Sequence, residues 1–174
     1  MPEPRPLSKD MLARAYERAD HYRLLNEPAQ AESICRDILA VEPENEKAWV
    51  QLLLSLTDQF PDEMSQALEA ANEALGNLKN EYHRAYYQGI IHERWGRANL
   101  NLGRGQQAAQ SWIRQAMQSY QKAMELAPSD DPDPTLRWNT CARLLEKSTQ
   151  SATKYAAGSS RDIQSEYDEV PRRN

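Results

Sequence analysis

The spacing of small and bulky residues is the sequence feature that most limits what this chain can fold into. Between Leu12 and Pro43, apolar or small residues recur at the helical period in two short runs, each with a polar opposite face. Pro28 suits the first turn of the second run, and Pro43 marks its end. Neither predicted helix is apolar all round, so this helical hairpin needs neighbouring helices to bury its apolar side.

The same spacing returns further along the chain, which supplies those neighbours. Ala19 and Leu53 hold matching places that lie 34 residues apart. The matching segments, unit by unit, are Ala19-x2-Tyr22 with Ala31-x3-Cys35-x2-Ile38 and Pro43, Trp49-x2-Leu52-Leu53-x2-Leu56 with Ala67-x3-Ala71-x2-Ala74, Gly89-x2-His92 with Ala116-x3-Tyr120-x2-Ala123 and Pro128, and Trp138-x2-Cys141-Ala142-x2-Leu145. Three units and part of a fourth therefore share one pattern.

Over Leu12 to Lys147 the chain resembles the tetratricopeptide-repeat family, whose repeat is 34 residues long. The resemblance implies an all-α fold in which helical hairpins stack as a short right-handed superhelix. We expect one domain at 9–148, with hairpins at about 9–41, 45–78 and 81–127 and a final helix at 135–148. Residues 1–8 form the expected extended leader, and 149–174 the expected mobile polar tail.

The third hairpin is predicted to be longer than the others. Gly89 to Ala116 spans 27 residues, whereas the matching stretch from Ala19 to Ala31 spans 12. Shared between two helices, the extra residues add about two turns, or roughly 11 Å, to each. The segment 103–105, Gly-Arg-Gly, provides the turn. We therefore expect the tip of this hairpin to extend past its neighbours.

Two residues depart from the family pattern. His92 stands in a place where Tyr is usual, and Ala71 stands where a large aromatic side chain is common. The second unit is therefore expected to pack thinly around Ala71.

Composition excludes several classes of function. The 174 residues suit one domain, and the net charge of −5 offers no basic field for nucleic acid. The chain has neither a signal-peptide core nor an apolar run long enough for membrane insertion, which predicts a cytoplasmic protein. Cys35 and Cys141 fall on predicted buried stripes, as expected of small core residues in a reducing compartment.

No arrangement of residues predicts catalysis, a metal or a cofactor. His92-Glu93 lacks the second histidine that would place two zinc ligands on one helix face. The glycine-containing stretch 96–105 follows a helix and lacks the Lys-Ser/Thr of a phosphate-binding loop. We interpret that stretch as a hairpin turn and expect no enzyme activity.

The resemblance implies that the first helix of each hairpin lines the concave side of the stack. The side chains expected there are apolar and aromatic in the middle, with charges at one rim. They are Tyr16, Asp20, Arg23, Lys47, Val50, Leu54, Thr57, Tyr86, Tyr87, Ile90 and Glu93. Exposed clusters of apolar side chains and Tyr are typical of contact sites between proteins, so we predict a binding groove here. The alternative is that some of these residues pack against the next hairpin.

A second candidate surface is the tip of the third hairpin. Trp95 lies close in sequence to Arg94, Arg97 and Arg104, with Trp112 on the facing helix. Trp and Arg are the residues most enriched at the energetic centres of interfaces. The alternative is that both tryptophans fill space between the lengthened helices.

These observations predict a protein-interaction module, an adaptor or scaffold that binds an apolar peptide or helical segment of another protein in its groove. Family members that clamp a terminal carboxylate use basic residues at slots that hold Tyr16, Asp20, Gln51, His83 and Tyr87 here, which favours an apolar partner. A chaperone of the type III secretion class and a constitutive assembly subunit docked through the third hairpin are the alternatives. A homodimer through the final helix also stays open, because no partner helix for it is recognisable.

Overall fold

The computed structural model describes residues 3–60 and 64–149 of the chain. These residues are helical apart from short connections and contain no strand, which confirms the all-α prediction. After a 3₁₀ turn, η1 (Lys9–Met11), come α1 (Leu12–Leu24), α2 (Pro28–Val41), α3 (Glu46–Asp58), α4 (Met64–Gly76), α5 (Glu81–Asn101) and α6 (Gln106–Leu126). A further helix, called the final helix below, covers 133–149.

Local sequence signals set several helix ends. The side chains of Asn45 and Asn80 accept hydrogen bonds from the backbone N–H groups of Ala48 (3.2 Å) and His83 (3.1 Å), which caps the first turns of α3 and α5. The turn between α5 and α6 uses glycine at 103 and 105 in the left-handed region, with φ of 65° and 71°. These signals explain why the chain reverses direction where it does.

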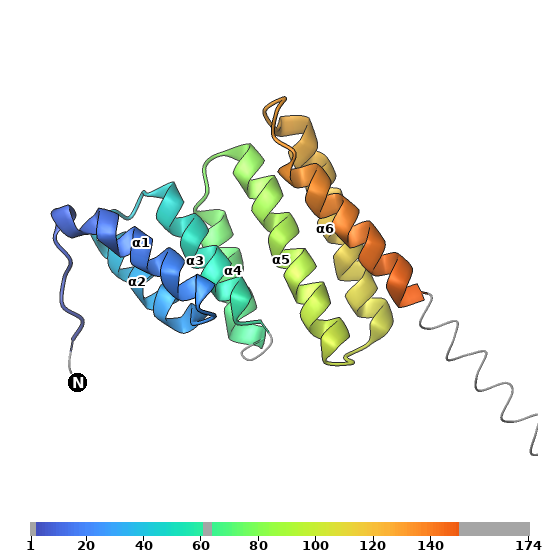
Figure 1. Ribbon diagram of the computed structural model, residues 1–174, viewed down its shortest axis with the longest axis horizontal. Helices are drawn as coiled ribbons and strands as arrows, with labels where there is room; N and C mark the ends of the chain where they lie inside the picture. Colours follow the sequence, from blue (N-terminus) through green and yellow to red (C-terminus); the bar gives the residue numbers. More distant parts are fainter. Residues whose placement is uncertain (1–2, 61–63, 150–174) are drawn as a thin grey trace, which may run out of the picture.

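The helices lie in two layers. In Figure 1, α1, α3, α5 and the final helix form the front layer, and α2, α4 and α6 lie behind them. Each helix from α1 to α6 contacts the next one along the chain, and α3 also contacts α1 and α5 within the front layer. The first helices of successive hairpins are therefore neighbours, which brings their exposed sides together on one surface.

The buried residues form two clusters. The N-terminal core consists of aliphatic, small and aromatic side chains from α1 to α4 and from the connections after α3 and α4, with Ile91 and Ala98 from α5. Its members are Leu12, Ala19, Cys35, Ile38, Leu39, Ala48, Leu52, Leu53, Leu56, Phe60, Ala67, Ala71, Ala74, Leu78, Ile91 and Ala98. The C-terminal core consists of Ile90, Ile113, Ala116, Tyr120 and Cys141, from α5, α6 and the final helix.

Two glycines let α5 and α6 approach closely. A Cβ atom on Gly89 would lie 2.6 Å from Tyr120 Cδ1, and one on Gly96 would lie 2.6 Å from Ile113 Cδ1. Both distances are far too short for carbon atoms in contact. The absence of side chains at these places therefore allows Tyr120 and Ile113 to fill the space between the two long helices.

The final helix packs against the third hairpin. Cys141 is fully buried in the C-terminal core, and Trp138 and Leu145 pack against that core. Its far end is fixed to the start of α6, because the Gln110 side chain donates a hydrogen bond of 2.9 Å to Ser148 Oγ. Most of its exposed residues are polar: they are Asp133, Thr135, Leu136, Arg143, Glu146, Lys147 and Thr149.

Candidate functional site

Five of the residues predicted for the groove are partly exposed on successive helices of the front layer. They are Tyr16 of α1, Val50 and Leu54 of α3, and Tyr86 and Tyr87 of α5, and we call them the inner row. Each is partly buried, and each packs against one or both cores. Leu54 and Tyr87 contact both cores and so join the two halves of the surface. The inner row is apolar and phenolic, and every member keeps part of its surface in solvent.

The prediction that three other groove residues lie at the surface is wrong. Ile90 is only 1% exposed and belongs to the C-terminal core, and Thr57 and Glu93 are also buried. Ile90 holds the place in α5 that Leu54 holds in α3. It is buried because the final helix, through Cys141 and its neighbours, completes the cluster around it. The groove prediction therefore fails where the final helix packs.

The predicted charged residues on α1 are engaged in holding the helices together. Asp20 accepts a hydrogen bond of 2.7 Å from the Gln51 side chain, and Arg23 Nε donates one of 2.8 Å to Asp58. Asp58 also forms an ion pair with Arg94 of α5. One carboxylate thus links α1, α3 and α5. Because these charges already have partners, they offer little for clamping a charged ligand.

Aromatic contacts continue the inner row at both ends. The Lys47 ammonium lies 4.5 Å from the centroid of the Tyr16 ring, in cation–π geometry. The rings of Tyr86 and Tyr87 meet edge to face with centroids 5.2 Å apart, and Tyr82 lies 6.0 Å from Tyr86. Burial raises the pKa of Tyr86 and of Tyr87 above the usual tyrosine value, so both phenols stay neutral at physiological pH.

A buried carboxylate lies directly behind this surface. Glu93 is 1% exposed and accepts a hydrogen bond of 2.7 Å from the Tyr120 hydroxyl. Arg137 of the final helix lies 3.5 Å from the same carboxylate and also bonds to Tyr86. Sequence reasoning missed Arg137 and Tyr82. The one available signal was the polar residue at 137 next to Trp138, because a charge beside a buried aromatic often marks a contact between helices.

The tip residues do not gather into one surface. Trp95 is partly buried and packs edge to face on Phe60, with ring centroids 5.3 Å apart, and it also meets Trp112 at 6.4 Å. Arg94 points to α3, where it binds Thr57 Oγ1 at 2.6 Å. Trp95 and Arg94 therefore join the second and third hairpins, and the prediction that Arg94 belongs to the tip is wrong.

The remaining two tip candidates are exposed. Arg97 lies one turn after Glu93, with its guanidinium 3.7 Å from that carboxylate, and Arg104 lies in the turn between α5 and α6. The contact between Trp95 and Phe60 fixes where α3 ends relative to α5. Residues 96–101 therefore extend α5 beyond α3 by about 9 Å.

A half-open hollow lies between α2, α3 and α4. Its volume is about 320 Å³, and its wall includes Trp49, Leu52, Ala70 and Ala74. Ala71 does not line this hollow and is fully buried in the N-terminal core, so thin packing around Ala71 stays a prediction.

Two kinds of chemistry find no support in the described residues. Burial raises the pKa of the Cys35 and Cys141 thiols to about 12, so neither is a thiolate at neutral pH. Among the residues described, no group of three or more His, Cys, Asp or Glu side chains is placed to hold a metal ion. In the same residues, no helix has the length and apolar content required to cross a bilayer.

No protein-family model matches this chain, and no curated protein matches it significantly.

Proposed function

We propose that the protein is a cytoplasmic tetratricopeptide-repeat domain that binds an apolar segment of another protein against the inner row. The observation that carries the proposal is the inner row itself, five partly exposed apolar and phenolic side chains from three successive front-layer helices. Partly exposed clusters of this kind are typical of contact sites, and Tyr is favoured within them.

The electrostatics of the surface indicate the chemistry of the partner. Asp20 and Arg23 are already bound to α3, and Glu46 lies 2.7 Å from the His83 ring. Lys47, above Tyr16, is the exposed cation next to the row. A bound segment would therefore be held mainly by two or three apolar side chains, as in extended or helical peptides that dock in grooves.

A peptide library displayed on phage tests this proposal. Peptides selected on the wild-type protein are synthesised and titrated calorimetrically against Val50→Glu and Tyr86→Glu. We expect the peptides to share two or three apolar residues and to lose roughly tenfold or more in affinity, since a carboxylate must then be buried against them. The matched control is Gln118→Glu, which adds the same charge at an exposed position of α6 in the rear layer.

Two results would contradict the proposal. One is a library that yields no binder, and the other is a set of binders that Val50→Glu and Tyr86→Glu leave unchanged while circular dichroism shows both variants folded. The sequences of the binders also separate an adaptor from a chaperone. An adaptor selects one motif, whereas a chaperone of the type III secretion class accepts many unrelated apolar segments.

A second candidate function is a constitutive subunit docked through the third hairpin. It is favoured by Leu102, which is 45% exposed at the end of α5, beyond the reach of α3. In that case Leu102→Glu would abolish assembly with the partner, while Tyr86→Glu would leave it unchanged. Co-purification of the partner with each variant distinguishes this function from groove binding.

A further inference from the structure

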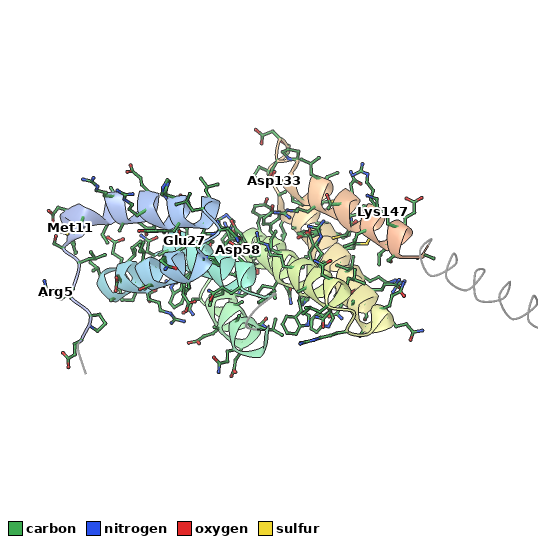
Figure 2. All side chains as sticks on the ribbon, turned by 60° about the horizontal axis from the view of Figure 1, so that its bottom comes forward. Arg5, Met11, Glu27, Asp58, Asp133 and Lys147 are labelled. Carbon is green, nitrogen blue, oxygen red and sulfur yellow. The ribbon has the colours of Figure 1, made fainter. Side chains whose placement is uncertain are left out.

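The N-terminal end of the molecule carries an apolar surface that is only partly covered. Residues of α1, α2, the 3₁₀ turn η1 and the segment before it line an open hollow of about 410 Å³. Leu7, Met11, Ala15 and Ile34 form its apolar part; Leu7 is partly buried and packs against the N-terminal core, and Met11 is 53% exposed. Figure 2 shows Met11 at the opposite end of the molecule from Lys147. We call this surface the end face.

The two ends of the stack differ in how they meet solvent. At the C-terminal end the final helix turns Trp138 and Cys141 onto the C-terminal core and exposes Arg143 and Glu146. Terminal units of stacked helical repeats require a polar outer side of this kind to stay soluble. The end face carries charges only at its border, so its apolar centre stays partly open to solvent.

Charges of both signs border the end face, on opposite helices. Arg14 and Arg18 lie one turn apart on α1, and Asp37 lies on α2. No ion pair joins any of the three to another residue within 3–60 or 64–149. A basic edge on one helix and an acidic edge on the other make the face complementary to itself.

We propose that the end face binds a second copy of this chain, giving a dimer with two-fold symmetry. The axis runs parallel to α1 and α2 and between them, so that α1 of each copy lies over α2 of the other. Arg14 and Arg18 then face Asp37 of the second copy, while Met11, Ala15 and Ile34 pack at the centre. A two-fold axis across the helices would instead set arginine against arginine.

The same charges separate this dimer from other assemblies. Head-to-tail growth would place the apolar end face against the outer side of the final helix, where Leu136 is the one apolar residue among the exposed side chains and Arg143 and Glu146 would lose solvent. A dimer through the final helix would have to bury Arg143 and Glu146. The isologous contact is the one that covers apolar surface on both copies and pairs the bordering charges.

Sedimentation equilibrium of the full chain and its variants tests the proposal. We expect a reversible wild-type dimer, and a loss of roughly tenfold or more in dimer affinity for Asp37→Arg, which sets like charges together. The triple variant Arg14→Glu, Arg18→Glu, Asp37→Arg exchanges the signs and is expected to restore the dimer. Glu146→Arg on the final helix is the matched control and leaves association unchanged. Thermal unfolding checks that every variant is folded.

Three results would overturn the inference. The first is a wild-type protein that stays monomeric at all concentrations; if removal of 150–174 then produces a dimer, the occupant of the end face is the chain's own terminal segment. The second is a dimer that survives Asp37→Arg. The third is a dimer that Glu146→Arg disrupts, which would place the contact at the opposite end. Tyr86→Glu should leave the dimer intact, because the inner row lies on another surface.

Discussion

The N-terminal and C-terminal cores both lie between packed helices, but they differ in the polar groups buried beside them. The N-terminal core is built from apolar side chains, and the polar groups buried near it, such as Ser55 and Thr57, are neutral and bond to backbone carbonyls of their own helix. The C-terminal core lies against a buried carboxylate, Glu93, that binds Tyr120 and Arg137. The ion pairs beside the first core, at Asp58, are partly exposed, whereas the second core depends on a fully buried charge that must stay paired.

The difference follows from what each core has to hold. Consecutive hairpins with the repeat pattern fit side by side through small and large residues. The final helix follows an acidic, proline-containing connection and has no repeat partner within the described residues. Pairing Glu93 with Arg137 gives that helix a directional contact that apolar packing does not provide.

Removing Tyr120 should have the largest effect on this comparison. Tyr120→Ala empties a fully buried site and removes a hydrogen-bond donor from Glu93, so we expect a loss of about 4 kcal/mol in the free energy of unfolding. Tyr120→Phe keeps the ring and should lose about 1–2 kcal/mol. Urea denaturation measures both values. If Tyr120→Phe leaves the free energy of unfolding unchanged, the hydrogen bond to Glu93 contributes nothing to stability.

Replacing Arg137 beside the C-terminal core should lower the free energy of unfolding more than replacing Arg23 beside the N-terminal core. Arg137→Leu leaves a carboxylate that is 1% exposed with a weaker set of partners, and we expect a loss of about 2–3 kcal/mol. Arg23→Leu should cost about 1 kcal/mol or less, since Asp58 keeps Arg94 and is partly exposed. Equal losses in urea denaturation would mean that the buried charge does not distinguish the two halves.

Adding one methyl group at the α5–α6 contact should have an intermediate effect. Gly89→Ala forces the Tyr120 ring to move, and we expect a loss of about 2 kcal/mol. Gly76→Ala is the matched control, because nothing lies within 4 Å of the added Cβ. That change should be neutral or stabilise the fold by about 0.5 kcal/mol through the unfolded chain. The melting temperature of Gly89→Ala should therefore fall, whereas that of Gly76→Ala should stay the same or rise.

Acid should destabilise the C-terminal half through protonation of His92, and this is the smallest of the predicted effects. Burial against Trp112 lowers the pKa of His92 below its usual value of 6.5, so the unfolded chain takes up the proton first. The neutral His92 side chain contributes fully to stability above pH 6.5, and this contribution is lost as the pH falls from 6.5 through the lowered pKa. His92→Gln should reduce the drop in melting temperature between pH 7.5 and pH 5.5, by about 1 °C or more. Exposed His21→Gln, the control, should leave the drop unchanged.

The sequence predicted the helices and their turns well, and the exposure of single residues less well. Asn45, Asn80 and the glycines at 103 and 105 act within one or two turns of the chain, so their effect is visible in the sequence. The two cysteines on predicted buried stripes are both fully buried, which confirms that prediction. The places of Tyr16, Val50, Leu54, Tyr86 and Tyr87 on the front layer also follow from helical spacing.

Leu54 and Ile90 show where such spacing stops being informative. They hold matching places in α3 and α5, yet Leu54 is partly exposed and Ile90 is 1% exposed. The difference arises from the final helix, which lies far along the chain and covers only one of the two. Trp95 shows the same effect, because Phe60 reaches it from the end of α3.

The sequence by itself determined that this chain forms amphipathic helices paired as hairpins, the third longer than the others, because helical period, caps and turns depend on neighbours a few residues away. Only the tertiary structure decided which equivalent positions stay at the surface, which arginines pair with Asp58 and Glu93, and which end of the molecule keeps an apolar surface partly exposed. The physical reason is that burial and ion pairing depend on contacts with segments far along the chain, and the local spacing of residues does not specify those contacts.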